Sequence, residues 1–131
     1  MQSLKKTLNA NEPSAYYALG RRLNRTGAYP QASEVLTRLV ELIPNHSLAH
    51  YELGFALLQQ FSRQSEAIEH FRQAIDICPH IARAYYFLGW ALVRIKRDFA
   101  AAKQLLDQIK EFRTYEAQHL AHLISLNKPS D

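Results

Sequence analysis

The chain lacks the features that mark a disulfide-stabilised, secreted or membrane-spanning protein. Cys78 is its only cysteine, which excludes an intrachain disulfide bond and a zinc site made of several cysteines. No segment approaches the run of about 18 apolar residues that a spanning helix needs. Residues 1–8 also lack the apolar stretch of a signal peptide. We therefore expect a cytoplasmic protein, whether or not the sequence is an excerpt of a longer one.

The chain also has no concentrated charge. Its net charge of +4 comes from 16 basic and 12 acidic residues, and the basic residues are scattered from Lys5 to Lys128 in runs no longer than two. A nucleic-acid-binding protein usually clusters its basic residues along one face, so nucleic-acid binding is not favoured. With 131 residues, 47% of them apolar, the chain can bury the core of one domain or a small solenoid.

Glycine is rare, and its placement is informative. Three of the four glycines stand in copies of one phrase, at residues 17–23, 51–57 and 86–92. Each copy has a tyrosine, then Leu-Gly, then a leucine, and Gly20, Gly54 and Gly89 lie 34 and 35 residues apart. Ala32, Ala67 and Ala102 recur at intervals of 35. A repeat of this period is typical of a helical solenoid.

Apolar residues three and four apart predict two helices in each copy. Pro13 is compatible with a helix start, Gly27 should end that helix, and Pro44 and Pro79 should end the second helices of the first two copies. A last helix should pack through Leu120, Leu123, Ile124 and Tyr115. The predicted segments are an N-terminal segment, a short helix or a frayed end, at 1–12, helix pairs at 13–46, 47–81 and 82–114, a capping helix at 115–126 and a tail at 127–131.

The repeated phrase resembles the tetratricopeptide repeat family, and the resemblance covers roughly residues 13–113. It implies an all-α fold: a right-handed α-solenoid of three antiparallel helix pairs with a capping helix. The residues that match the repeat signature are Leu19, Gly20, Ala32, Pro44, Leu53, Gly54, Ala67, Pro79, Leu88, Gly89 and Ala102. A glycine inside a helix costs about 0.5–1 kcal/mol against alanine, so we expect close helix packing there, with Ala32, Ala67 and Ala102 as the facing small surface.

In this family the first helix of each pair lines a concave surface. The resemblance therefore implies that the groove is lined by residues outside the packing set: Ser14, Tyr17, Arg21, Asn24, Arg25, Leu48, Tyr51, Glu52, Phe55, Leu58, Gln59, Arg83, Tyr86, Phe87, Trp90, Val93 and Arg94. Tyr17, Tyr51 and Tyr86 should form one ladder across this surface, and Arg21, Phe55 and Trp90 a second.

These residues predict a protein-interaction module, an adaptor or chaperone-like protein, that binds a peptide of apolar or aromatic and partly acidic character. Two alternatives stay open: the aromatic residues fill helix contacts, or the chain is a scaffold that self-assembles by stacking into a homo-oligomer. Some members hold a terminal carboxylate in a lysine- and asparagine-rich clamp. Tyr17, Arg21, Glu52, Arg83 and Phe87 stand at the corresponding sites, which argues against that mode.

No residue pattern indicates an enzyme, a cofactor or a metal site. His46 and His50 are four residues apart, and His119 and His122 three apart, but neither pair has a nearby third ligand. Surface or packing roles are therefore favoured for them. The sequence leaves open the identity of the partner, whether it binds as a strand or a helix, the oligomeric state, and whether either end of the chain covers the groove.

Overall fold

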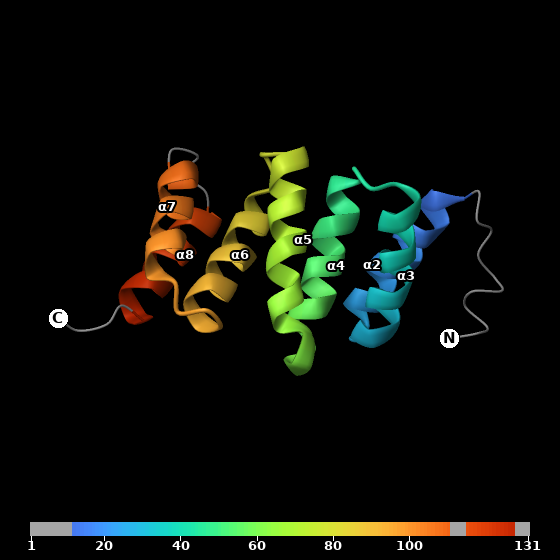
Figure 1. Cartoon of the computed structure of the whole chain (residues 1–131), viewed down its shortest axis with the longest axis horizontal. Helices are drawn as coiled ribbons and strands as arrows, with labels where there is room; N and C mark the ends of the chain where they lie inside the picture. The colour runs from blue at the N-terminus through green and yellow to red at the C-terminus, as the bar shows by residue number, and fades with distance from the viewer. Residues whose placement is uncertain (1–11, 111–114, 128–131) are drawn as a thin grey trace.

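The computed structural model describes residues 12–110 and 115–127, and within them the chain is helical and contains no strand. Figure 1 shows the helices in a row from the N-terminal to the C-terminal end, with α2 overlapping α3 and α7 overlapping α8. They are α2 (Pro13–Arg25), α3 (Tyr29–Leu42), α4 (Ser47–Leu58), the short 3₁₀ helix η1 (Phe61–Arg63), α5 (Gln64–Ile77), α6 (Ala82–Arg94), α7 (Phe99–Ile109) and α8 (Tyr115–Asn127).

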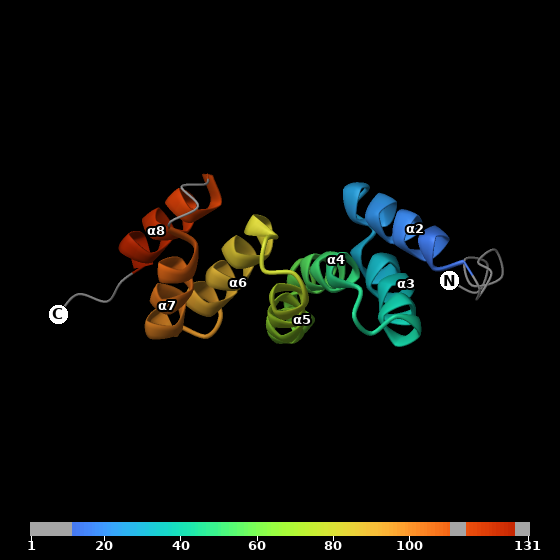
Figure 2. The same ribbon diagram turned by 90° about the horizontal axis from the view of Figure 1, so that it is seen from above.

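Successive helices form the predicted antiparallel pairs, α2 with α3, α4 with α5 and α6 with α7. Each pair also packs on the next, through α3 and α4 and through α5 and α6. Seen from above, the chain forms an arc in which α2, α4, α6 and α8 follow one side and α3, α5 and α7 the other (Figure 2). The predicted all-α solenoid is confirmed.

The helix ends follow the residues that the sequence marks. Gly27, just after α2, has a φ of 83°, a left-handed conformation that glycine adopts without strain. Ile43 and Cys78 precede Pro44 and Pro79, and both leave the helical region at the ends of α3 and α5. Among the described helices, none is long and apolar enough to cross a membrane.

The repeated glycines are packing sites, but the prediction that alanines face them is wrong. A Cβ atom at Gly20 would lie 2.5 Å from the Leu36 side chain, and one at Gly54 would lie 2.9 Å from the Phe71 ring. At Gly89 the neighbour is Leu120 of α8, at 2.3 Å. The glycines therefore make room for large side chains. Ala32, Ala67 and Ala102 are fully buried elsewhere in the core.

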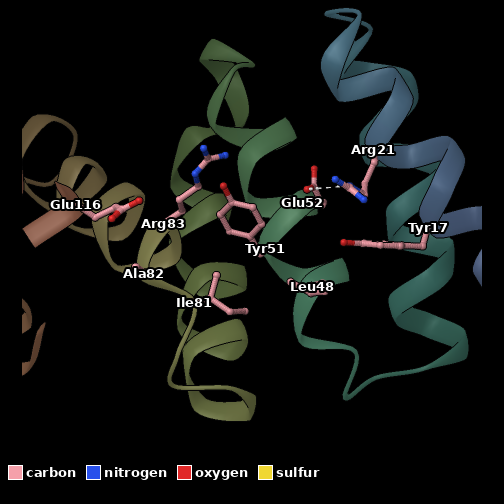
Figure 3. Close-up of a pocket in the computed structure, with 9 residues that line it drawn as sticks. All are labelled: Tyr17, Arg21, Leu48, Tyr51, Glu52, Ile81, Ala82, Arg83 and Glu116. Atoms are coloured by element: carbon pink, nitrogen blue, oxygen red, sulfur yellow. Dashed lines mark ion pairs between the residues drawn. The ribbon is translucent and has the colours of Figure 1, made fainter. Parts of the chain in front are cut away.

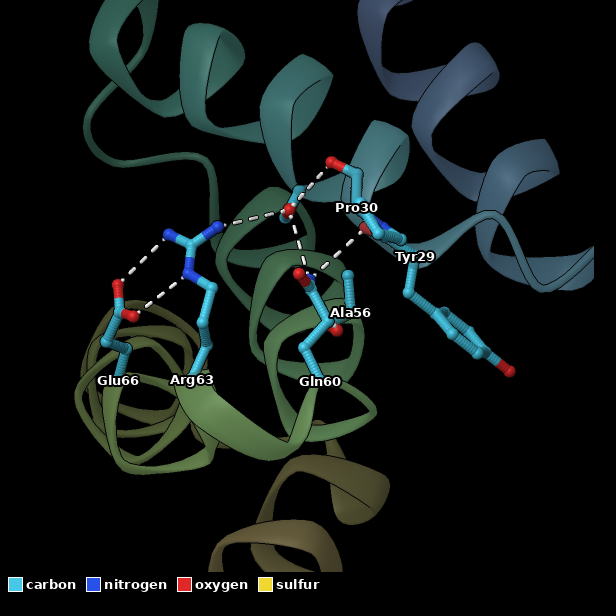
Figure 4. A network of polar contacts seen from close by, with 7 residues as sticks. Tyr29, Pro30, Ala56, Gln60, Arg63 and Glu66 are labelled. Carbon is cyan, nitrogen blue, oxygen red and sulfur yellow. Dashed lines mark hydrogen bonds and ion pairs between the residues drawn. The ribbon is translucent and has the colours of Figure 1, made fainter.

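A buried polar network joins the first two pairs (Figure 4). The Ser33 hydroxyl on α3 donates to the Pro30 carbonyl at 2.9 Å and accepts from Gln60 Nε2 at 3.2 Å. Arg63 donates to Ser33 at 3.5 Å and binds both carboxylate oxygens of Glu66, at 2.9 and 3.1 Å. Because Ser33 is almost fully buried, these contacts fix the α4–α5 turn on α3.

Helix α8 packs on α6 more extensively than on α7, with Leu120 and Ile124 buried and Leu123 partly buried. Tyr115 was expected on that packing face, but its side chain is 68% exposed. The predicted N-terminal segment falls outside the described residues apart from residue 12, as do residues 111–114 and most of the predicted tail.

Candidate functional site

Four open pockets lie along the hollow side of the arc, with volumes of about 420, 380, 300 and 250 Å³. They share lining residues: Arg83 belongs to three of them, and Tyr51 and Phe87 to two each. The pockets therefore form one continuous surface, which we call the groove. Its walls come from the first helix of each pair and from α8, with additions from Tyr29 and Gln64, the first residues of α3 and α5, and from Ile81 in the turn before α6.

The end of the groove beside α2 is polar. Asn24, which is 5% exposed, donates from Nδ2 to the Glu52 backbone carbonyl at 3.0 Å and to its carboxylate at 2.9 Å. Arg21 Nε lies 3.8 Å from the other Glu52 oxygen, the ion pair drawn in Figure 3. The Arg21 guanidinium also lies 5.6 Å from the centre of the Tyr17 ring. Glu52 thus neutralises Arg21 and ties α2 to α4.

The middle of the groove holds Tyr51, Arg83 and Glu116, from α4, α6 and α8 (Figure 3). Burial raises the pKa of Tyr51, and the nearby Glu52 carboxylate raises it further. Arg83 opposes this through its charge and a hydrogen bond to the Tyr51 hydroxyl, while Glu116 adds a small increase. The tyrosine is therefore a neutral hydroxyl at physiological pH. Arg83 shares this pocket with the Tyr51 hydroxyl and the Glu116 carboxylate.

Aromatic rings from three helices meet at Phe87. Its ring centre lies 5.4 Å from that of Phe55, 6.3 Å from Tyr51, 6.0 Å from Phe71 and 5.3 Å from Tyr86. The Phe55 and Tyr86 contacts are edge-on and the Phe71 contact is stacked, arrangements that aromatic pairs favour. Phe71 is fully buried, so this cluster joins the groove floor to the core.

The end of the groove between α4 and α6 combines apolar, aromatic and amide side chains. Leu58, Phe87 and Trp90 line a pocket there with Gln59, Gln64 and Tyr86. Arg94, the last residue of α6, has its guanidinium 6.0 Å from the centre of the Trp90 ring and lies outside the lining of the four pockets. A cation over an indole face shields the ring from water without closing the pocket.

Helix α8 supplies one wall of the groove, which the sequence reasoning missed. Tyr115, Glu116 and His119 line a pocket with Arg83, Tyr86 and Phe87. The His119 ring lies 3.8 Å from Tyr115 and 6.3 Å from Tyr86, centre to centre. The signal in the sequence is their spacing: Tyr115, Glu116 and His119 are three and four residues apart, which places them on one face of a helix. The capping helix therefore extends the groove and leaves it open.

The structure brings fourteen of the seventeen predicted groove residues to these pockets, and the exceptions are Ser14, Val93 and Arg94. Several predicted orientations are wrong. Tyr51 and Leu58 are 9% and 4% exposed, so each presents only an edge to the groove. Val93 is fully buried and Asn24 nearly so, because their helices pack tightly at these positions.

The two predicted ladders are replaced by other contacts. The Tyr17 ring packs on His46 at 5.1 Å, whereas Tyr51 and Tyr86 both pack on Phe87. Phe55 pairs with the Tyr29 ring at 6.1 Å and with Phe87. The sequence reasoning also missed lining residues that lie at helix starts and turns: Tyr29, Gln64, Ile81 and Ala82.

The groove offers charge and aromatic surface without the arrangement of a reaction centre. Among residues 12–110 and 115–127, no group of three potential metal-ligating side chains lies close enough to hold an ion. The lining cations are Arg21, Arg25 and Arg83, and the lining anions are Glu52 and Glu116. What the arrangement can do is bury apolar side chains of another molecule between polar edges.

The chain is similar to known repeat proteins in sequence and in fold. A family model described as tetratricopeptide repeat matches residues 17–80. The TPR2B domain of yeast Sti1, solved as a complex with pHsp70, has a TM-score of 0.75 at 21% identity, covering 87% of this chain and 94% of that one. The TPR2AB domain of yeast Sti1, solved with pHSP90, has a TM-score of 0.78 at 21% identity, covering 98% of this chain and 53% of that one.

A third solved structure, the MamA RS-1 ArsTM double mutant, has a TM-score of 0.68 at 19% identity and covers 94% of this chain and 78% of that one. At these identities the likeness establishes the fold. A comparison with curated protein sequences gives no significant match.

Proposed function

We propose that this chain is a tetratricopeptide-repeat protein, a non-enzymatic adaptor or chaperone-like module whose groove binds a peptide segment of a partner protein. The observation that carries this proposal is the run of connected pockets on the hollow side. The Sti1 domains of the same fold were solved with peptide partners, which supports protein binding as the class of function.

The groove chemistry favours a ligand with large apolar side chains. Trp90, Phe87 and Tyr86 offer ring faces and edges around the pocket between α4 and α6, and aromatic residues are among the commonest anchors of binding energy. Glu52 neutralises Arg21, and Arg83 lines one pocket with the Tyr51 hydroxyl and the Glu116 carboxylate. The acidic character expected of the ligand is therefore confined to the flanks, beside Arg25 and Arg94.

The test is a selection from a random peptide library on the immobilised chain, followed by affinity measurements with variants. Trp90→Ala and Arg83→Ala remove groove side chains that are partly or fully exposed, so the fold should survive. Phe61→Ala and Arg72→Ala are matched controls, because Phe61 is 92% exposed on the α4–α5 turn and Arg72 is exposed on α5.

We expect Trp90→Ala to weaken binding by about 30-fold, the effect of losing an anchor worth about 2 kcal/mol. Arg83→Ala should act in the same direction, and both controls should bind like the wild type. Unchanged affinity in both groove variants would exclude the groove as the binding site. Light scattering on the free chain tests self-assembly separately: a mass that grows with concentration would favour the scaffold alternative.

A further inference from the structure

Three histidine side chains hold the first turn of α4 in place. His50, which is 4% exposed, places Nε2 2.7 Å from the carbonyl oxygen of Pro44, in the turn before the helix. Its other nitrogen, Nδ1, lies 3.1 Å from Nδ1 of His70 on α5. The two rings are stacked, with centres 5.4 Å apart and planes at 23°. One buried imidazole thus joins a turn to a neighbouring helix.

The chemistry of these contacts fixes where the protons lie. A carbonyl oxygen only accepts, so His50 must carry its proton on Nε2. A neutral His50 then has a lone pair on Nδ1, and His70 must donate to it from Nδ1–H. The pair can hold one extra proton, on the free Nε2 of His70. A second extra proton would set two N–H groups and two positive charges against each other.

His46, one helical turn before His50, also requires a ring nitrogen that carries no proton. It is the residue that caps α4, and its Nδ1 accepts a hydrogen bond from the Ala49 backbone amide at 3.1 Å. A proton on that nitrogen would abolish the cap and place a positive charge at the positive end of the helix dipole. Burial lowers the pKa of His46, a hydrogen bond with its own backbone opposes this, and the neighbouring His50 lowers the pKa further.

The charged and titratable groups around the three histidines do not remove the need for unprotonated ring nitrogens. Burial lowers the pKa of His70, and His50 does so next, while Glu69 and Glu66 of α5 oppose the effect. Arg63 binds Glu66 and lowers the pKa of His70 slightly. From α2, the Tyr17 ring packs on His46. Burial raises the pKa of Tyr17, so it stays neutral where histidines titrate.

We propose that His46, His50 and His70 form an acid-sensitive latch that fixes the start of α4 on the preceding turn and on α5, and that opens when the cluster takes up more than one proton. An unfolded chain binds three extra protons on these side chains in acid, whereas the latched state has room for one. The opening of the latch loosens Leu48, Tyr51 and Glu52, the α4 wall of the groove. Only this last effect, on a bound peptide, rests on the proposed function.

The test compares urea denaturation at pH 7.5 and pH 5.5. His46→Asn keeps a capping oxygen that does not titrate, and His50→Gln offers an N–H to Pro44 and an oxygen to His70. His122→Gln is the matched control, because His122 is exposed on α8.

On lowering the pH, the unfolding constant of the wild type should rise about 100-fold more than that of the His46→Asn/His50→Gln variant, since an ordinary histidine pKa of about 6.5 gives about tenfold for each proton excluded from the native state. His46→Asn alone should remove about tenfold of that rise. The control should behave as the wild type. An equal rise in the wild type and the double variant would overturn the latch.

A second readout keeps the proposal testable if the double variant fails to fold. Long-range proton–nitrogen NMR correlations on the wild type at neutral pH should show the Nε2–H tautomer at His50 and the Nδ1–H tautomer at His70. The opposite tautomer at His50 would contradict the proposal. For a peptide selected on the groove, affinity should fall in acid for the wild type only. Acid-independent affinity beside acid-dependent stability would remove the coupling to the groove and leave the latch.

Discussion

The turns that open the second and third helix pairs share one design and differ in chemistry. In the second pair, His50 Nε2 contacts the Pro44 carbonyl at 2.7 Å; in the third, the Tyr85 hydroxyl donates to the Pro79 carbonyl at 3.0 Å. Both side chains stand six residues after their proline and 35 residues apart in the sequence. The repeat therefore requires a buried donor at this position and leaves its identity free.

The difference decides which turn responds to pH. Burial raises the pKa of Tyr85, so its hydroxyl remains a neutral donor throughout the physiological range. His50 needs a specific tautomer and a partner, His70, whereas the residue 35 positions after His70 is Leu105, an apolar side chain that is nearly buried. Acid sensitivity thus belongs to one copy of a repeated turn.

The second and third helix pairs should differ most in the side chain that fills the space above the repeated glycine. Phe71 fills the space above Gly54, but Leu106, the residue 35 positions after Phe71, is only partly buried, and Leu120 of α8 fills the space above Gly89. We expect Phe71→Ala to lower the free energy of unfolding by about 3–5 kcal/mol and Leu120→Ala by about 2–5 kcal/mol. Leu106→Ala should cost less than either, about 1–2 kcal/mol.

Chemical denaturation of the three variants measures this order. An effect of Leu106→Ala as large as that of Phe71→Ala would show that α7 holds the third pair as α5 holds the second, and that α8 is dispensable to the core. The matched variant Leu126→Ala, at an exposed position of α8, should leave stability within about 0.5 kcal/mol of the wild type.

The packing of Leu120 against Gly89 also shows how much of the fold could be predicted from the sequence. The spacing of Gly20, Gly54 and Gly89 gave the repeat, because close helix packing leaves a periodic trace in the chain. The spacing of the glycines could not show which side chain fills the space above each of them, because an alanine or a leucine on the facing helix is compatible with the same spacing. The assignment of Ala32, Ala67 and Ala102 to that role failed for this reason.

The groove was predictable to a similar extent. The resemblance to the tetratricopeptide repeat family implied that Tyr17, Phe55 and Trp90 line the concave side, and all three line pockets there. Periodicity carries no information on how far a neighbouring helix extends over that face. Val93 therefore proved to be buried, and the contributions of Tyr29 and Glu116, from segments outside the repeated phrase, were missed.

The expected difference in pH response between the two turns can be tested by introducing a histidine pair into the third helix pair. Tyr85→His with Leu105→His should make the third turn acid-sensitive, because the imidazole that donates to Pro79 cannot be protonated while it accepts from its partner. Its native pKa then lies below the unfolded value of about 6.5, so stability is present above that pH and is lost as the pH falls. At pH 5.5 the added loss should be about 1.4 kcal/mol per excluded proton.

Denaturation curves of this variant and the wild type at pH 7.5 and pH 5.5 give the comparison. Tyr85→Phe with Leu105→Met is a control that changes the same two sites without introducing a titrating group. A transplant whose stability fell no more in acid than that of the control would show that the geometry of the second turn does not carry over to the third.

A smaller effect is expected when only the donor of the third turn is removed. Tyr85→Phe leaves the packing of the ring and deletes the bond of 3.0 Å to the Pro79 carbonyl. We expect a loss of about 1 kcal/mol in the free energy of unfolding, the usual contribution of one hydrogen bond. The loss should be the same at pH 7.5 and pH 5.5, since the pKa of the Tyr85 hydroxyl is raised by burial and the deleted group is neutral at both. A loss confined to acid would mean that Tyr85 acts through a neighbour that titrates.

The smallest effect should come from Glu52, whose counterpart 35 residues later is Phe87 at the centre of the aromatic cluster. Glu52→Gln keeps an oxygen for the Asn24 amide and removes only the ion pair with Arg21, a contact of 3.8 Å to a side chain that is 47% exposed. We expect a loss of no more than about 0.5–1 kcal/mol, vanishing at about 1 M salt, where charges are screened beyond about 3 Å. A loss above about 2 kcal/mol that persists in salt would mean that the buried Asn24 requires the full carboxylate. The polar α2 end of the groove would then depend on Glu52 as strongly as the aromatic centre depends on Phe87.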